Sequence, residues 1–231
     1  MRRLRQPFSG PSDFRASLLM SDDRSTWIRQ SSQLALVTAG FHVLQFLASA
    51  VLWMIAGSAS LAAFGLDAIV SAFASFVLAI RIHRSFETLG DNWRSRGAAI
   101  GYLAGAAIAL YLAVSQLWWR HWSTGTVQQG DRSPLVLGIV LAAVSMLVIP
   151  IVGSYMKVLA VELRSQPLKA AAIFTFGNSY LSMVLLVALL INAGMGFRWG
   201  DAVGGLVMFP FLAQKGLQIL IDEGKQEYVE E

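Results

Sequence analysis

The chain has 231 residues, of which 55% are hydrophobic and only 14% are charged. About a quarter of the residues of a soluble domain are charged, so this composition excludes an ordinary soluble protein and indicates a polytopic membrane protein. The sequence contains no cysteine, which excludes disulfide and thiolate chemistry.

Six apolar segments are each long enough to cross a bilayer core about 30 Å thick. In chain order they cover residues 33–56, 58–80, 97–119, 134–159, 168–194 and 202–221. The first two are separated only by a short stretch that begins at Gly57, which predicts a tight hairpin.

Gly97, Gly101 and Gly105 recur every four residues and predict a small-residue packing face. Pro150 and Pro210 are expected to kink their helices.

The predicted fold class is therefore an all-α membrane protein, a six-transmembrane-helix bundle. We expect a basic N-terminal tail (1–30), a transmembrane domain (31–221) and a short acidic tail (222–231). Fifteen of the 18 lysines and arginines fall on one side of this topology, which places both termini in the cytoplasm. The first thirty residues do not resemble a signal peptide. We expect an integral plasma-membrane protein of the bacterial inner-membrane type, whose basic tail contacts lipid rather than nucleic acid.

One acidic residue, Asp67, lies about 13 Å into its apolar segment, near the middle of the bilayer. A carboxylate at that depth costs about 2.5–3.5 kcal/mol, so it indicates a functional site. Three segments carry polar residues at helical spacing, which predicts one inward polar face on each. These residues are Thr38, His42 and Gln45; Ser60, Asp67 and Ser71; and Thr175, Asn178 and Ser182.

If these faces meet, Asp67 has His42, Gln45, Ser71 and Asn178 as neighbours, in a cation or proton site. Asp67 and His42 are the candidate metal ligands, for a divalent cation such as zinc. The alternative is that these polar groups hydrogen-bond between helices and fix the packing. Lys157 and Lys215 are interpreted as interfacial anchors whose side chains reach toward water. We find no set of residues that predicts an enzyme.

The segment 57–82, GSASLAAFGLDAIVSAFASFVLAIRI, resembles the second helix of a short, six-helix branch of the cation diffusion facilitator superfamily. The motif around Phe64-Gly65-Leu66-Asp67 carries most of this resemblance. Residues 170–207 resemble the fifth-helix and sixth-helix segment of the same branch, through Tyr180-Leu181-Ser182 and Trp199-Gly200-Asp201. The resemblance extends over roughly 29–221.

This resemblance implies a six-helix fold, often dimeric, and export of divalent cations in exchange for protons. It also implies a metal between the second and fifth helices, held by carboxylates and histidine. The sequence departs from the pattern at Gln45, Ser71 and Ala171, where the branch has acids, and at Phe174 and Asn178, where it often has Gln and Cys. Asp67 alone keeps its acid.

These observations leave three alternative functions open. The first is a divalent-cation transporter. The second is a transport-inactive accessory subunit or scaffold in a larger membrane complex, and the third is a proton or monovalent-cation pathway through Asp67 and His42. Its expected partners are the bilayer and either a second copy of the chain or a larger complex. We expect Asp67 to be neutral, or hydrogen-bonded to His42 or Asn178.

Overall fold

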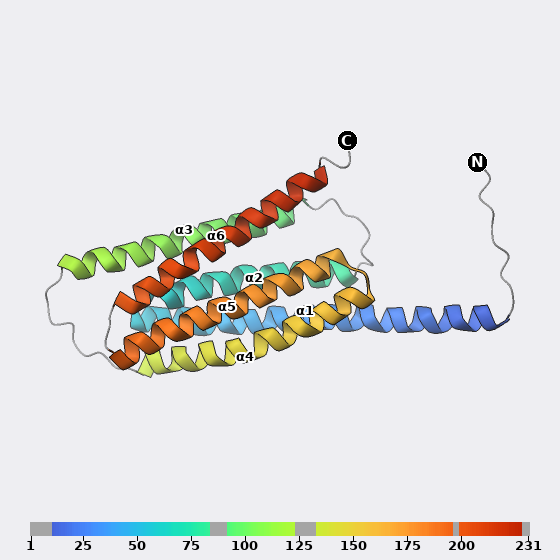
Figure 1. Cartoon of the computed structure of the whole chain (residues 1–231), viewed down its shortest axis with the longest axis horizontal. Coiled ribbons are helices and arrows are strands. Elements are labelled where there is room, and N and C mark those ends of the chain that lie inside the picture. The colour runs from blue at the N-terminus through green and yellow to red at the C-terminus, as the bar shows by residue number, and fades with distance from the viewer. Residues whose placement is uncertain (1–10, 84–91, 123–132, 196–198, 228–231) are drawn as a thin grey trace.

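The computed structural model describes residues 11–83, 92–122, 133–195 and 199–227, and these residues form six α-helices (Figure 1). The helices are α1 (Pro11–Ala56), α2 (Ala59–His83), α3 (Asn92–Trp122), α4 (Ser133–Glu162), α5 (Gln166–Met195) and α6 (Trp199–Glu227). Each contains a segment long and apolar enough to span a membrane. In the described residues, the prediction of an all-helical chain with six helices able to span a membrane is therefore confirmed.

The first helix is longer than the apolar segment that predicted it. It begins at Pro11, inside the segment predicted as a basic tail, and runs without interruption to Ala56, so that its first part projects beyond the other helices (Figure 1). Proline is well tolerated at the first position of a helix. The chain then reverses at Gly57, whose φ of 63° favours glycine. The predicted hairpin between the first two spans is thus confirmed.

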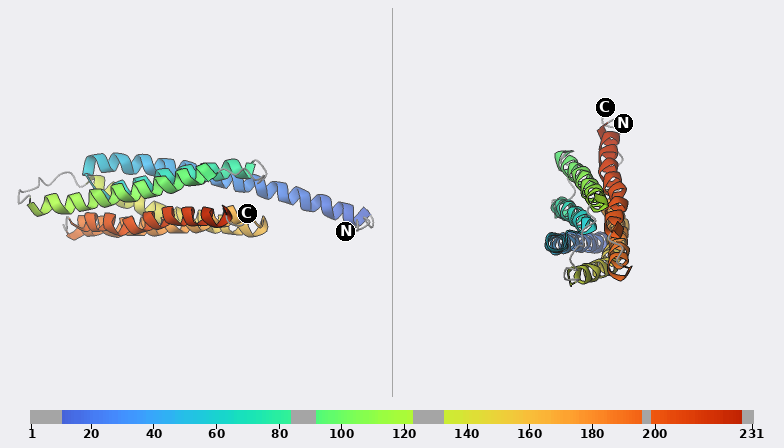
Figure 2. Two further views of the ribbon diagram at one scale, coloured as in Figure 1. Left: turned by 90° about the horizontal axis from the view of Figure 1, so that it is seen from above. Right: turned by 90° about the vertical axis from the view of Figure 1, so that its left-hand side faces the viewer.

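The helices form a closed ring in the order α1, α2, α3, α6, α5, α4. The most extensive contacts join α1 to α2, α4 to α5 and α3 to α6, and α2 also contacts α5 and α6 across the ring. The end-on view in Figure 2 shows this arrangement, with α2 and α5 facing each other inside the bundle. Polar side chains on α2 and α5 therefore meet away from lipid.

Glycine allows close approach at two of the three predicted positions on α3. A Cβ at Gly101 would lie 3.1 Å from the Val70 side chain, and one at Gly105 would lie 3.4 Å from Leu212, whereas Gly97 faces open space. Gly101 and Gly105 thus pack α3 against α2 and α6. Pro150 and Pro210 both lie inside continuous helices.

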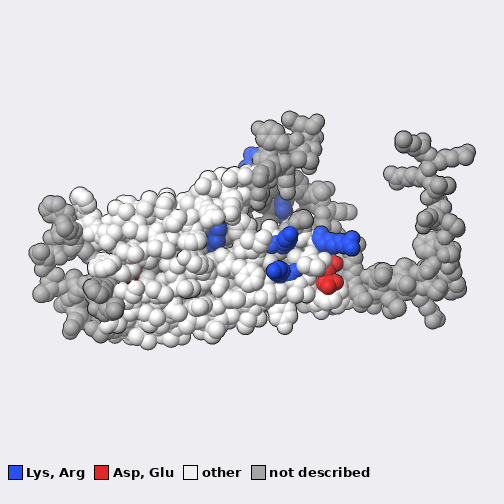
Figure 3. All heavy atoms as spheres, viewed as in Figure 1, with Lys and Arg blue, Asp and Glu red and all other residues white. Residues whose placement is uncertain are grey.

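The outer surface of the bundle is largely apolar. Large aliphatic or aromatic side chains are exposed on each of the six helices. On the face shown in Figure 3, charged side chains gather toward the end from which α1 projects, and most of the remaining surface is uncharged. This distribution fits a bundle whose sides contact lipid.

Candidate functional site

Asp67 lies on α2 in the interior of the bundle, with 2% of its surface exposed. Its Oδ1 atom accepts a hydrogen bond from Nζ of Lys215 on α6, at 2.6 Å. Lys215 is itself 6% exposed. The attraction between the two opposite charges offsets part of the cost of holding either one away from water.

This ion pair corrects the interpretation of Lys215 and the predicted hydrogen-bond partners of Asp67. Lys215 is not an interfacial anchor, because its ammonium group is buried against Asp67. The partner of Asp67 is this ammonium, and within the described part of the chain its carboxylate makes no hydrogen bond with His42 or Asn178. The signal that could have revealed the pair was electrostatic: an ionisable group deep in a membrane requires a partner of opposite charge, and Lys215 lies well inside the sixth helix.

Asn178 on α5 holds the other side of the lysine. Its Oδ1 atom accepts a hydrogen bond from the Lys215 ammonium. Its Nδ2 atom donates to the hydroxyl of Ser71 at 3.0 Å and lies 3.4 Å from Nε2 of His42. Because an ammonium group only donates, the amide oxygen must face Lys215 and both amide hydrogens remain for Ser71 and His42.

Tyr102 on α3 completes the surroundings of the ammonium. Its hydroxyl is hydrogen-bonded to Ser71 at 3.0 Å, and its ring centroid lies 5.3 Å from Nζ of Lys215. That distance is within the range of a cation–π interaction. Lys215 is therefore held by a carboxylate, an amide oxygen and an aromatic face.

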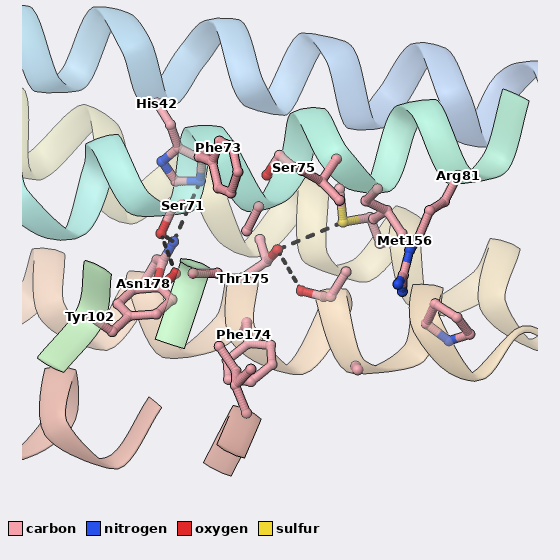
Figure 4. A pocket seen from close by; sticks show the side chains of 18 residues that line it. His42, Ser71, Phe73, Ser75, Arg81, Tyr102, Met156, Phe174, Thr175 and Asn178 are labelled. Atoms are coloured by element: carbon pink, nitrogen blue, oxygen red, sulfur yellow. Dashed lines mark hydrogen bonds between the residues drawn. The ribbon is translucent and has the colours of Figure 1, made fainter. Parts of the chain in front are cut away.

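His42 on α1 extends the network to α4. Its Nδ1 atom is 2.9 Å from Oε1 of Gln45, and Nε2 of Gln45 donates to the Ser145 hydroxyl at 2.9 Å. Since the amide oxygen can only accept, Nδ1 carries the hydrogen and Nε2 is free to accept from Asn178. A neutral imidazole satisfies both contacts. Figure 4 shows His42, Ser71 and Asn178 meeting between α1, α2 and α5.

All five predicted site residues are thus buried and belong to one network. The members are His42 and Gln45 (α1), Asp67 and Ser71 (α2), Tyr102 (α3), Ser145 (α4), Asn178 (α5) and Lys215 (α6), so every helix contributes. Tyr102, Ser145 and Lys215 were not predicted. Other residues of the polar faces, Thr38, Thr175 and Ser182, donate to backbone carbonyl groups of their own helices.

A cavity of about 220 Å³ lies beside this network, between α2 and α5. His42, Ser71, Tyr102 and Asn178 form its polar end, and Arg81 lies at its other end (Figure 4). Pro167, at the start of α5, also lines the cavity. Apolar side chains such as Phe73, Met156 and Phe174 line the space between them. The cavity therefore extends from the network toward the end of the bundle where α2 ends and α5 begins.

The donor set is poor for a divalent cation. Among the residues that the structure describes, no three His, Cys, Asp or Glu side chains come together as a metal site. Asp67 already has a cation beside it, and His42 is separated from Asp67 by Asn178 and Lys215 in the hydrogen-bond network. A zinc ion usually takes about four ligands from these residue types.

A second buried carboxylate, Asp201 at the start of α6, closes the opposite end of α2. It accepts hydrogen bonds from the backbone N–H groups of Ala59 and Ser60, at 2.9 and 3.3 Å. The Ser58 hydroxyl donates to it at 2.6 Å, and the Ser60 hydroxyl also donates to it. A carboxylate at a helix N-terminus satisfies free N–H groups and complements the helix dipole. Asp201 thus ties α6 to α2.

No known protein-family model matches this sequence, and a comparison with curated proteins finds no match.

Proposed function

We propose that this protein is a six-helix membrane protein of the cation diffusion facilitator type whose cation site is filled by its own Lys215, and that it serves as a non-transporting subunit of a larger membrane complex. The observation that carries the proposal is the buried ion pair between Lys215 and Asp67. The lysine supplies the positive charge that the single acid requires.

The rest of the network supports the same conclusion. The resemblance implies further acids at three positions, which are Gln45, Ser71 and Ala171 in this chain. Gln45 and Ser71 instead form hydrogen bonds with their neighbours, and alanine carries no polar group. The site therefore has one negative charge, and Lys215 already neutralises it. A divalent ion entering this site would lose its hydration shell and would meet an ammonium group, without a second carboxylate to offset either cost.

A subunit role also agrees with what the network does mechanically. Hydrogen bonds, an ion pair and a cation–π contact connect all six helices. Such cross-links stabilise one arrangement of the bundle, whereas alternating access requires one group of helices to move against the other. A bundle held in one arrangement is suited to presenting a constant surface to other membrane proteins.

Purification from native membranes in mild detergent tests this role. We expect the protein to elute with one or more other membrane proteins in fixed stoichiometry, and we expect an Asp67→Asn/Lys215→Met double variant to keep the same partners. Recovery of the wild type as a free monomer or homodimer alone would contradict the proposal.

The cavity supports a second candidate, a proton or cation pathway. It connects the polar network to the end of the bundle near Arg81, so a hydrated ion could approach His42 and Asn178 from that side. Proteoliposomes loaded with a pH-sensitive dye test this candidate. Proton movement in response to a zinc or sodium gradient, lost in an Asp67→Asn variant, would favour the pathway over the subunit role.

A further inference from the structure

A second hollow lies on the outside of the bundle, where α4 turns into α5. Its volume is about 470 Å³. Its walls combine three basic residues, Lys157, Arg164 and Lys169, with apolar side chains that include Val161, Ile173 and Phe176. This hollow, the α4–α5 groove, is separate from the network around Asp67.

The three basic residues of the α4–α5 groove are exposed. None of them forms an ion pair or a side-chain hydrogen bond with any residue that the structure describes. Glu162 is exposed in the same region but does not line the groove. Within the described part of the chain, the groove therefore presents three positive charges without an ion-pair partner, at the end of the bundle where Figure 3 shows charged side chains gathering.

Arg164 has a backbone conformation that its residue type disfavours. Its φ is 49°, in the left-handed region. The N–H of Ser165 donates to the carbonyl of Ala160 at 3.0 Å, and the N–H of Arg164 donates to that of Val161 at 3.2 Å. These two bonds define a Schellman motif in which the left-handed position is usually glycine. The turn itself does not need an arginine side chain, which leaves that side chain for the groove.

The apolar part of the groove continues onto the lipid-facing surface. Ile173 and Phe176 are 62% and 40% exposed. They lie on α5 after Lys169, so an acyl chain placed along them would bring its headgroup to the basic residues. A soluble phosphate would use the cations but would leave these apolar side chains uncovered. Basic pockets between transmembrane helices commonly bind the headgroups of anionic lipids.

We infer that the α4–α5 groove binds an anionic phospholipid, with its phosphate on Lys157, Arg164 and Lys169 and an acyl chain along Ile173 and Phe176. The inference does not depend on the proposed function, because it uses none of the residues around Asp67. A lipid without net charge is disfavoured, since its positive amine would meet the same three cations.

Lipid titration of the full-length protein in a non-ionic detergent, read by native mass spectrometry, tests the inference. Phosphatidylglycerol and phosphatidylcholine with the same acyl chains are the two probes. We expect the wild type to bind phosphatidylglycerol in preference to phosphatidylcholine. Each lost cation should weaken that binding about fivefold, and the Lys157→Gln/Arg164→Gly/Lys169→Gln variant about a hundredfold. Arg29→Gln removes an exposed arginine on α1 and should bind phosphatidylglycerol like the wild type.

The single variant Arg164→Gly separates lipid binding from folding. Because glycine suits the left-handed position, its thermal midpoint in detergent without added lipid should equal or exceed that of the wild type. Its gain in midpoint on adding phosphatidylglycerol should be smaller than that of the wild type. Equal binding of the two lipids, equal binding by the triple variant, or competition by millimolar inorganic phosphate as effective as by the lipid would each overturn the inference.

Discussion

The ion pair between Asp67 and Lys215 makes the sharpest quantitative prediction. Both groups are buried, and their charged atoms are 2.6 Å apart. Removing one partner of a buried pair leaves an uncompensated charge and costs about 3–5 kcal/mol, whereas replacing both by neutral groups of similar volume is often close to neutral. We therefore expect strong coupling between the two positions.

The two single variants are expected to differ. Asp67→Asn leaves the ammonium with the Asn178 oxygen and the Tyr102 ring, so its cost should lie near 3 kcal/mol, at the low end of the range. Lys215→Met leaves the carboxylate without its cation and removes a charge-assisted hydrogen bond from Asn178. Its cost should therefore lie near 5 kcal/mol.

The assay is reversible unfolding in mixed micelles of a non-ionic detergent and dodecyl sulfate, followed by tryptophan fluorescence. The double variant Asp67→Asn/Lys215→Met should unfold within about 2 kcal/mol of the wild type, which gives a coupling energy of several kcal/mol. Arg29→Met, at an exposed arginine without an ion pair among the described residues, is the control and should change stability by less than about 0.5 kcal/mol. A coupling energy below about 1 kcal/mol would refute the buried pair.

Three further predictions use the same unfolding assay. Asp201→Ala should cost about 2–4 kcal/mol, because the N–H groups at the start of α2 lose the carboxylate that accepts their hydrogen bonds. A loss below about 0.5 kcal/mol would count against this contact. Asn178→Leu should cost about 2–4 kcal/mol, because it removes an acceptor from a buried ammonium and two donors from the network; wild-type stability would show that the network is not formed. Gly204→Ala should cost about 1–3 kcal/mol, because the new Cβ would lie 2.5 Å from the Cβ of Ala188. The control Gly194→Ala places its Cβ in open space and should not destabilise the protein. Equal effects of the two substitutions would contradict the packing of α6 against α5.

Much of the fold could be predicted from the sequence because each transmembrane helix satisfies its own backbone. The six apolar segments follow from hydropathy, and the hairpin follows from the short stretch that begins at Gly57, where the structure has a positive φ. The order of the helices around the ring could not be predicted, since it depends on which side chains pack across pairs such as α3 and α6. The extension of α1 back to Pro11 was missed because hydropathy does not report a polar helix.

The site was predicted in part. Helical spacing brought His42, Gln45, Asp67, Ser71 and Asn178 to inward faces, and the structure joins them in one network. The partner of Asp67 was missed because the prediction weighed polar residues on three segments only.

Lys215 in the sixth segment was interpreted as an interfacial anchor because it lies near the end of that segment. That reasoning neglects the free energy that a buried carboxylate gains from a cation within reach. The capping role of Asp201 was not predicted, because a residue on one helix that caps another helix leaves no local pattern in the sequence.

Zinc flux into proteoliposomes tests the central claim most directly, because that claim is that Lys215 fills the cation site beside Asp67. Wild-type protein and an Asp67→Asn variant would be reconstituted at equal density around a zinc-sensitive dye, with empty vesicles as the baseline. The account predicts that neither protein raises zinc entry above the baseline. Saturable zinc entry through the wild type that is lost in Asp67→Asn would contradict it.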